Sequence, residues 1–279
     1  QDQEIARTAL RRLTAGERLD AVIDRAADGG ADAERAANVL AQLGEDGIRA
    51  LAVCALTEAD PERAERLASR LLAQGPAAAQ APVLERLASP ERETARRAIR
   101  LAERIGTNDA VARIADLLRS EDAFVREAAG AALARLGQPE GADDAQALRA
   151  LVRALAAADP QLPPLAIECL AATKSPRAVP ALASALHAAI EARELENSRD
   201  LIRALGELGR PEASTELGKV VLRRDLLGRK RLRELKMAAI RALGQLPGDD
   251  AVGVLSQAAR LRDTQLRDAA QTALERRSR

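Results

Sequence analysis

Four glycines recur at a fixed interval in the first half of the chain. Gly44, Gly75, Gly106 and Gly137 are each 31 residues apart, and each closes a stretch with helical character. Self-similarity at a period of about 20–50 residues is typical of arrays whose repeats are small supersecondary units. Glycine is favoured just beyond a helix C-terminus, because the left-handed conformation there carries no Cβ penalty. The interval therefore predicts that every period ends one helix and begins another.

The composition favours helices over strands. Ala, Leu, Arg and Glu dominate the chain, and these residues lose little side-chain entropy in a helix. Trp and Tyr are absent and Phe124 is the single Phe, so a core must be built from Leu, Ile, Val and Ala. Such a core suits closely packed helices and gives a β-sandwich little to pack. We expect an all-α fold.

The repeating unit is predicted to be a pair of helices. Residues 122–136 carry apolar side chains three and four positions apart, which indicates one buried stripe. Asp122 stands where an N-cap is expected. A second helix is expected after a short break in each period, over residues 46–56, 77–88, 109–118 and 144–156.

The same unit continues beyond Gly137 with looser spacing. Further pairs are expected at residues 163–172 with 176–190, 198–208 with 212–222, and 232–246 with 250–261, before a last helix at 266–276. Because one pair cannot bury its apolar stripe alone, neighbouring pairs must stack. We therefore expect an α-solenoid, a right-handed superhelix of about eight helix pairs.

Two segments carry a family resemblance. DAFVREAAGAALARLG at residues 122–137 and SPRAVPALASAL at residues 175–186 resemble the two halves of a bacterial HEAT repeat of the phycobilisome-lyase-like type. Residues 235–255 repeat the pattern, and only the first 30 or so residues match weakly. The resemblance implies a single HEAT-like array over residues 1–279. It also implies an interaction scaffold, a role that such repeats often fill as the non-catalytic part of a longer chain.

The sequence offers little for catalysis. His187 is the only histidine, so neither a multi-histidine metal site nor a Ser-His-Asp system with a supporting histidine can be assembled. Cys54 and Cys169 lie far apart without C-x-x-C spacing, which indicates small buried residues in a reducing compartment rather than a disulfide. We expect no cofactor and no catalytic residue, and we expect that the chain is not an enzyme.

Adjacent acids at Asp143–Asp144 and Asp249–Asp250 could in principle serve acid–base chemistry or bind a metal. Both pairs immediately precede an expected helix. An Asp there accepts hydrogen bonds from unpaired N–H groups and favours the positive end of the helix dipole, so capping explains both pairs. Arg126 and Arg267 each follow an Asp by four residues, and we expect them to pair with it or to link successive repeats.

Two enzyme classes enter as alternatives through the resemblance. Phycobilin lyases, which give these repeats their name, attach or isomerise chromophores, and HEAT-like DNA glycosylases share the architecture. Two cysteines, one histidine and an almost complete lack of aromatic residues make a poor tetrapyrrole pocket. Base-modifying chemistry is expected to hold the base or sugar with aromatic side chains. A lyase-like enzyme therefore ranks below a binding function.

One local feature stands out, a basic insertion at residues 219–236, which we call the basic segment. It holds eight Lys or Arg against two acids, in a chain whose net charge is +1. The candidate binding residues are Lys219, Arg223, Arg224, Arg229, Lys230, Arg231, Arg233 and Lys236. Three interpretations stay open: a solvated loop, a site for an acidic protein or peptide, and a contact with phosphates of nucleic acid or lipid headgroups.

The function expected from the sequence is a non-catalytic protein–protein interaction scaffold. It would bind a protein or peptide, acidic in character, on a concave face formed by the second helix of each pair, and also through the basic segment. The alternative is a nucleic-acid-associated protein that contacts phosphates through the same segment, without aromatic residues to stack on bases.

The sequence has no apolar run long enough to span a bilayer and no opening signal segment, so we expect a cytoplasmic protein. Because the chain begins at Gln1 rather than Met, we expect it to be part of a longer protein.

Overall fold

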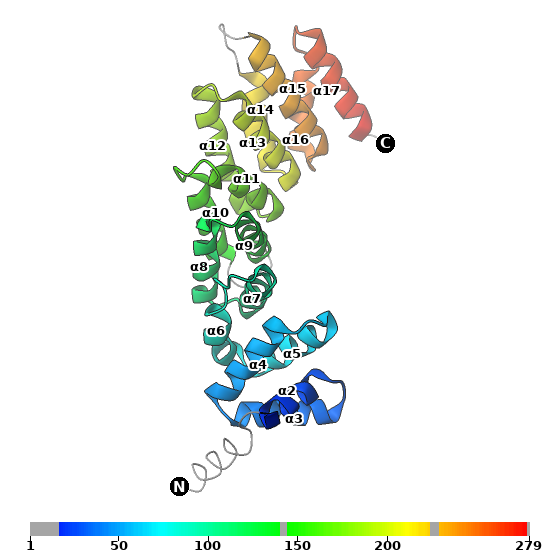
Figure 1. The fold of residues 1–279 in the computed structure, drawn as a ribbon. Helices are drawn as coiled ribbons and strands as arrows, with labels where there is room; N and C mark the ends of the chain where they lie inside the picture. Colours follow the sequence, from blue (N-terminus) through cyan, green and yellow to red (C-terminus); the bar gives the residue numbers. More distant parts are fainter. Residues whose placement is uncertain (1–16, 140–143, 224–228, 278–279) are drawn as a thin grey trace. The chain divides into compact units, whose positions relative to one another are not determined.

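The computed structural model describes residues 17–139, 144–223 and 229–277. Within these ranges the chain forms sixteen α-helices and two short 3-10 helices, and no strand (Figure 1). Ala, Leu, Ile and Val make up nearly all of the buried side chains. The expected all-α solenoid fold is confirmed, and the right-handed twist of the superhelix stays a prediction.

Contacts divide the chain into two compact units, Gln1–Ala132 and Leu133–Arg279. The helices of the first unit are α2 (Glu17–Ala27), α3 (Ala31–Gln42), α4 (Glu45–Thr57), α5 (Pro61–Ala73), α6 (Pro76–Leu84), α7 (Arg92–Ile105) and α8 (Asn108–Asp116), followed by the 3-10 helix η1 (Leu117–Arg119). Helix α9 (Ala123–Leu136) spans the boundary between the two units. Within the first unit, α4 packs against α6, and α6 packs against α8. The prediction that residues 1–279 form a single array stays a prediction.

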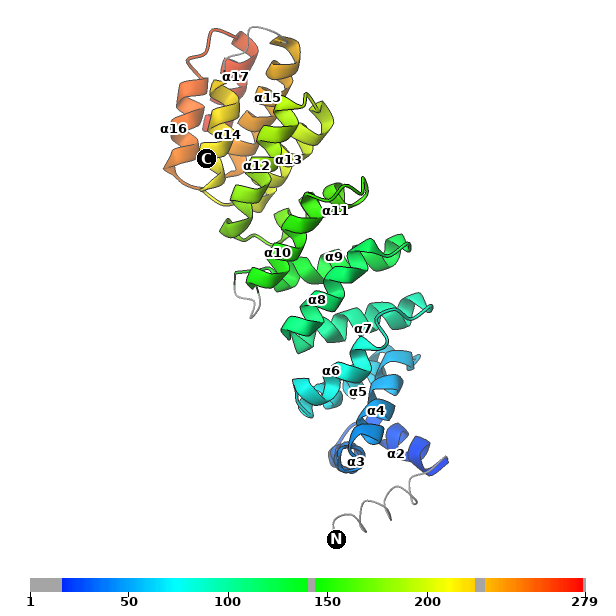
Figure 2. The same ribbon diagram turned by 90° about the vertical axis from the view of Figure 1, so that its left-hand side faces the viewer.

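The second unit repeats the alternation of helices. Its helices are α10 (Asp144–Leu155), α11 (Leu162–Ala172), the 3-10 helix η2 (Pro176–Ala178), α12 (Val179–Glu191), α13 (Leu195–Leu208), α14 (Ala213–Leu222), α15 (Arg229–Gln245), α16 (Asp249–Ala258) and α17 (Thr264–Arg277). Helices α11, α13, α15 and α17 pack in order as a layer of first helices, and α12, α14 and α16 form the layer of second helices (Figures 1 and 2). This arrangement places α13 directly beside α15.

The glycines behave less uniformly than their spacing suggests. Gly106 ends α7 in the left-handed conformation, with φ 63° and ψ 17°, as a helix C-terminus favours. Gly44 and Gly75 also have positive φ, but their ψ angles are extended and each immediately precedes the next helix. Gly137 does not adopt positive φ. Its N–H still donates to the Leu133 carbonyl over 2.9 Å, so the helical hydrogen-bond pattern of α9 runs through it.

The expected capping by acids is confirmed at one position and wrong at another. Asp122 Oδ1 accepts a hydrogen bond from the Phe124 N–H over 2.9 Å. Asp249 and Asp250 instead lie inside the first turn of α16, where Gly248 is the N-cap and neither side chain caps the helix. They still lie near the positive end of the helix dipole. Asp143 lies outside the described residues.

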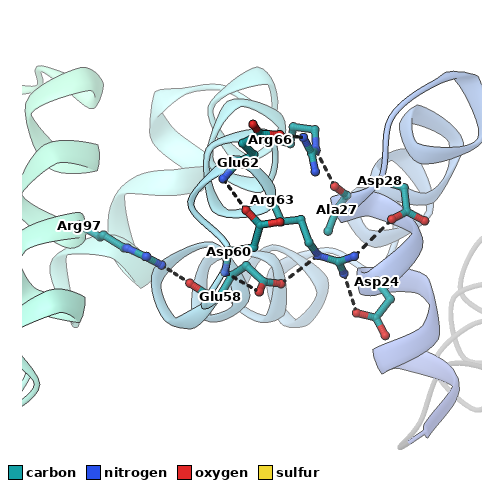
Figure 3. A network of polar contacts seen from close by, with 9 residues as sticks. All are labelled: Asp24, Ala27, Asp28, Glu58, Asp60, Glu62, Arg63, Arg66 and Arg97. Carbon is teal, nitrogen blue, oxygen red and sulfur yellow. Dashed lines mark hydrogen bonds and ion pairs between the residues drawn. The ribbon is translucent and has the colours of Figure 1, made fainter.

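We expected Arg126 and Arg267 to pair with the Asp four residues earlier or to link repeats. Among the described residues neither makes an ion pair with that Asp or a contact between repeats. Arg126 donates to the carbonyls of the preceding loop, including that of Ser120 over 2.7 Å, and Arg267 lies 3.8 Å from its neighbour Asp268. Other arginines make the long-range contacts. In the first unit, Arg63 of α5 lies within 3.3 Å of three carboxylates (Figure 3), those of Asp24, Asp28 and Glu58.

Candidate functional site

The basic segment starts at the end of α14 and continues into α15. Lys219 lies in the last turn of α14, and Arg223 follows that helix directly. The other described cations on α15 are Arg231, Arg233 and Lys236. Arg224 lies outside the described residues, as do the side chains of Arg229 and Lys230. The segment as a set of binding residues stays a prediction.

Two of these cations already have partners within the protein. Lys219 Nζ lies 2.9 Å from Glu216 Oε1, three residues earlier on the same helix. Arg233 Nε lies 2.9 Å from Asp263 Oδ2, in the loop before α17. The second contact joins two successive repeats, so Arg233 has a structural role that the sequence did not indicate.

Three described cations make no ion pair among the described residues: Arg223, Arg231 and Lys236. One guanidinium nitrogen of Arg231, Nη2, is buried there without a hydrogen-bond partner. Burial lowers the pKa of Lys236, although the nearby carboxylate of Asp263 acts in the opposite direction. A partly desolvated cation gains from the approach of a carboxylate, because the opposite charge restores its charged form.

The two units carry opposite net charge. The first unit has 19 Lys and Arg against 23 Asp and Glu, a net charge of −4, and the second has 24 against 19, a net charge of +5. The overall value of +1 conceals this difference. A net positive unit favours acidic partners by long-range attraction.

A groove of about 460 Å³ lies between α13 and α15 in the layer of first helices. Its lining residues on α13 are Glu196, Arg199, Asp200, Ile202, Arg203 and Glu207, and those on α15 are Ala238, Arg241, Ala242 and Gln245. Six of these ten side chains are charged. Long polar side chains therefore form the walls, and small residues of α15 lie between them.

Small residues explain why the two helices approach closely at this point. A Cβ atom on Gly206 of α13 would lie 2.9 Å from the Cβ atom of Ala242 on α15. Contacts this short are not tolerated, so only glycine allows the observed spacing. Small side chains at the contact and long ones beside it produce a surface depression.

The charged side chains of the groove are unequally paired. Arg199 Nη1 lies 3.2 Å from Glu196 Oε1, and Arg203 Nη2 lies 3.0 Å from Asp200 Oδ1. Arg203 Nη1 also lies 3.7 Å from Glu207 Oε1. All three pairs lie within α13. Arg241 of α15 is exposed and makes no ion pair or side-chain hydrogen bond among the described residues.

Sequence reasoning missed this groove. Arg241 occurs in a run of apolar helix residues, where a single outward arginine is unremarkable. The available signal was the recurrence of small residues on α15, Ala238 and Ala242, four positions apart on one helix face. Their pairing with Gly206 depends on the packing of two repeats.

The groups most suited to catalysis are dispersed. Burial raises the pKa of the Cys169 thiol to about 12, with a smaller contribution from Glu168, and burial together with nearby acids raises that of Cys54. His187 Nε2 lies 3.6 Å from Glu216 Oε2 on the neighbouring helix. Among residues 17–139, 144–223 and 229–277, no group of three or more His, Cys, Asp or Glu is placed to hold a metal ion.

The described part of the chain contains no helix that is both long enough and apolar enough to cross a membrane.

Comparisons with known proteins match one part of the chain to a repeat family. The family description for HEAT repeats matches residues 80–154. No curated protein matches the chain. Among solved structures, the chain is similar to importin beta, with 14% identity, a TM-score of 0.48, and coverage of 98% of this chain and 37% of that chain.

Two other similar structures contain enzymes. Human deoxyhypusine hydroxylase in complex with glycerol has 16% identity and a TM-score of 0.39, with 84% of this chain and 97% of that chain covered. The complex of CpcE and CpcF of phycocyanin lyase from Nostoc sp. PCC7120 has 19% identity and a TM-score of 0.35, with 82% and 94% covered.

Proposed function

We propose that this HEAT-repeat chain is a non-catalytic scaffold that binds an acidic segment of a partner protein through its basic segment. The observation that carries the proposal is the set of cations left without an ion pair among the described residues, Arg223, Arg231 and Lys236. They lie in the unit with the positive net charge. We further propose that the remainder of the partner lies on the concave face of the second helices.

Carboxylates are the natural ligands of these cations. A guanidinium presents a rigid fork of donors that matches a carboxylate, and the pair forms two parallel hydrogen bonds. The buried Nη2 atom of Arg231 lacks a hydrogen-bond partner among the described residues, and an unsatisfied donor is costly. The residue as a whole is only half-buried, so an incoming carboxylate can pair with the exposed part of the guanidinium.

The direct test reverses four charges of the basic segment. We would change Arg223, Arg229, Lys230 and Arg231 to Glu and measure binding of fluorescent poly-L-glutamate by polarisation. The wild-type chain should bind, and the variant should lose at least about tenfold in affinity. A matched control reverses four exposed arginines of the first unit, Arg86, Arg100, Arg113 and Arg119. Circular dichroism would confirm that both variants keep their helicity.

Equal binding by the wild type and the basic-segment variant contradicts the proposal. A nucleic-acid role is separated from it by the salt dependence of binding to a fluorescent DNA duplex. Phosphate contacts release counterions, so the affinity for DNA would fall steeply as salt is raised. If the duplex binds more tightly than poly-L-glutamate and shows that dependence, the protein-partner proposal is wrong and the nucleic-acid alternative holds.

An absorption spectrum tests the enzyme alternative. The chain contains no Trp and no Tyr, so the purified protein should be nearly transparent in the near ultraviolet and throughout the visible range. A visible band that persists through gel filtration would indicate a bound chromophore and favour a lyase-like function. A band near 260 nm that disappears in high salt would indicate bound nucleic acid.

A further inference from the structure

We infer that the groove between α13 and α15 is a second binding site, which takes a short extended segment of a partner protein with an acidic side chain facing Arg241. None of the lining residues of the groove belongs to the basic segment, so this inference does not depend on the proposed role of that segment. The charge, the floor and the size of the groove each support a peptide ligand.

Arg241 is the cation that an incoming acid would meet. Its side chain is exposed at the α15 wall and makes no ion pair among the described residues. A guanidinium in this state pairs with a carboxylate in a bidentate geometry without first giving up another partner. The acidic group therefore gains this contact without the loss of another ion pair.

The two arginines of the opposite wall can assist. Arg199 is 50% exposed and its partner Glu196 is 81% exposed, while Arg203 and Asp200 are each 54% exposed. Exposed pairs three residues apart on a helix contribute little to stability. Arg199 and Arg203 can therefore turn toward a ligand carboxylate without weakening the fold.

The carboxylates of the groove distinguish a peptide from a polyanion. Glu196, Asp200 and Glu207 lie on α13 among the three arginines, so the lining has no net charge. A nucleic-acid backbone would place phosphates against these carboxylates, and like charges in proximity repel. A peptide has acidic side chains for the arginines and backbone N–H donors for the carboxylates and for the Gln245 amide. The mixed lining therefore fits a polypeptide.

The floor of the groove limits the side chains that can enter. We call its apolar lining residues the floor: Ala238 and Ala242 of α15 and the buried Ile202 of α13. Small methyl groups leave room for a backbone to lie flat and for a small apolar side chain to contact the floor. A volume of about 460 Å³ lies in the range of small-ligand pockets. We therefore expect the bound segment to be a few residues long, with small apolar residues next to the acidic one.

The test identifies the ligand and the site together. A display library of random octapeptides is selected on the purified full chain, and enriched sequences are synthesised and measured by fluorescence polarisation. Enriched peptides should carry an Asp or Glu at a fixed position. Replacing that acid by its amide should weaken binding at least about tenfold, a loss typical of a charged hydrogen bond.

Variants of the chain test whether the peptide binds in the groove. R241E should lose at least about tenfold in affinity for the peptide, and Arg241→Lys should retain part of that affinity. R241E should recover binding to a peptide whose acid is changed to Lys. Ala238→Trp fills the floor and should also abolish binding. Arg149→Glu, which reverses an exposed arginine on α10 of the same unit, is the matched control and should bind as the wild type does.

Three outcomes overturn the inference. They are a selection that yields no enriched peptide, enriched peptides without an acidic preference, and equal binding by wild type and R241E. The basic-segment variant separates this site from the proposed function, because it should bind groove peptides with unchanged affinity. If that variant loses the peptides while R241E keeps them, the peptides bind the basic segment and the groove is not their site.

Discussion

Arg97 follows Arg66 by 31 residues, and each guanidinium donates to a backbone carbonyl 39 residues before it. Arg66 reaches the Ala27 carbonyl, and Arg97 reaches the Glu58 carbonyl (Figure 3). Because 31 residues is also the interval of the glycines, these are the same contact made in successive repeats. Each carbonyl lies at or just beyond the end of a helix, where backbone acceptors lack partners.

Removing the Arg97 contact should weaken the first unit. Arg97→Met keeps the length of the side chain but leaves the Glu58 carbonyl without this donor. Hydrogen bonds from charged groups contribute about 1.5–3 kcal/mol. Because Arg97 is only 18% exposed, we expect the free energy of unfolding to fall by an amount in that range. The measurement is urea unfolding followed by circular dichroism. Arg96→Met is the control, because among the described residues Arg96 pairs with Glu93 alone. It should lower the free energy of unfolding by about 0.5 kcal/mol or less.

A loss for Arg97→Met no larger than that for Arg96→Met would show that the contact is incidental. Arg66→Met provides an independent check. Its contact with the Ala27 carbonyl measures 2.8 Å, and its loss should be comparable because the geometry repeats.

The period predicted the helices well because it reports which side chains are buried. The helix expected at residues 46–56 spans Glu45–Thr57, and that expected at 266–276 spans Thr264–Arg277. Some helices end earlier than expected: the one expected at residues 77–88 ends at Leu84, and the one expected at 250–261 ends at Ala258. In the first of these, Leu84 and Leu87 keep a helical spacing of three residues, so the pattern alone did not mark the stop.

The polar contacts between repeats were beyond sequence reasoning. Arg126 was expected to pair with Asp122, whereas Asp122 Oδ2 accepts from Arg92, 30 residues earlier, over 2.8 Å. Exposed ion pairs differ little in energy, so spacing along the chain does not decide among several partners. The lateral packing of the helices decides which partner an arginine reaches, and that packing cannot be inferred from the sequence.

The two candidate sites differ in how visible they are in the sequence. The basic segment is a local excess of charge, so counting residues finds it. The groove depends on Gly206 and Ala242, 36 residues apart, whose approach requires both to be small. A contact of that kind follows from the register of two stacked repeats, which a single sequence does not fix.

Two glycine substitutions should have opposite effects. A Cβ atom on Gly47 would lie 1.9 Å from the Leu40 carbonyl oxygen, so Gly47→Ala forces α3 and α4 apart. Overpacking of this kind costs about 3 kcal/mol, more than the gain of about 1 kcal/mol from the helix propensity of alanine. Gly253 lies within α16 with no atom within 4 Å of an added Cβ. Gly253→Ala should therefore stabilise the chain by about 0.5–1 kcal/mol.

Urea unfolding of both glycine variants is the measurement. The first unit should lose stability in Gly47→Ala, and the second unit should gain in Gly253→Ala. A stabilised Gly47→Ala protein would show that α3 and α4 leave room for the added methyl group. A destabilised Gly253→Ala protein would show that the outer surface of α16 is covered.

Acid should weaken the first unit through two glutamates. The Asp60 N–H and then Arg63 hold the pKa of Glu58 below its ordinary value. Arg96 and then Arg97 do the same for Glu93. A carboxylate whose pKa is lowered by folding stabilises the fold above its unfolded pKa, and that contribution disappears as pH falls through the folded value. Thermal midpoints should therefore decrease below about pH 4.5, the ordinary pKa of these groups.

The Glu93→Gln variant tests the assignment, since a neutral amide has no such titration. Its thermal midpoint should be lower than that of the wild type at pH 7 and should depend less on pH between 5 and 3. Glu34→Gln, a change on the exposed side of α3, is the control. An unchanged pH dependence in Glu93→Gln would assign the acid sensitivity to other carboxylates.

The Cys169 thiol should be inert in the folded protein. Burial raises its pKa from the ordinary value of 9.0 to about 12, so at pH 8 almost none of it is the nucleophilic thiolate. In a Cys54→Ser background, Ellman's reagent should label the native protein very slowly and the urea-unfolded protein at once. A thiol whose pKa is raised by folding favours the fold below its unfolded pKa, and this contribution decreases as pH rises from 9 toward 12. Stability should therefore decrease over that window in Cys54→Ser and stay flatter in a Cys54→Ser, Cys169→Ala double variant. Rapid stoichiometric labelling of the native single variant at pH 8 would show that α11 opens readily and that burial does not protect the thiol.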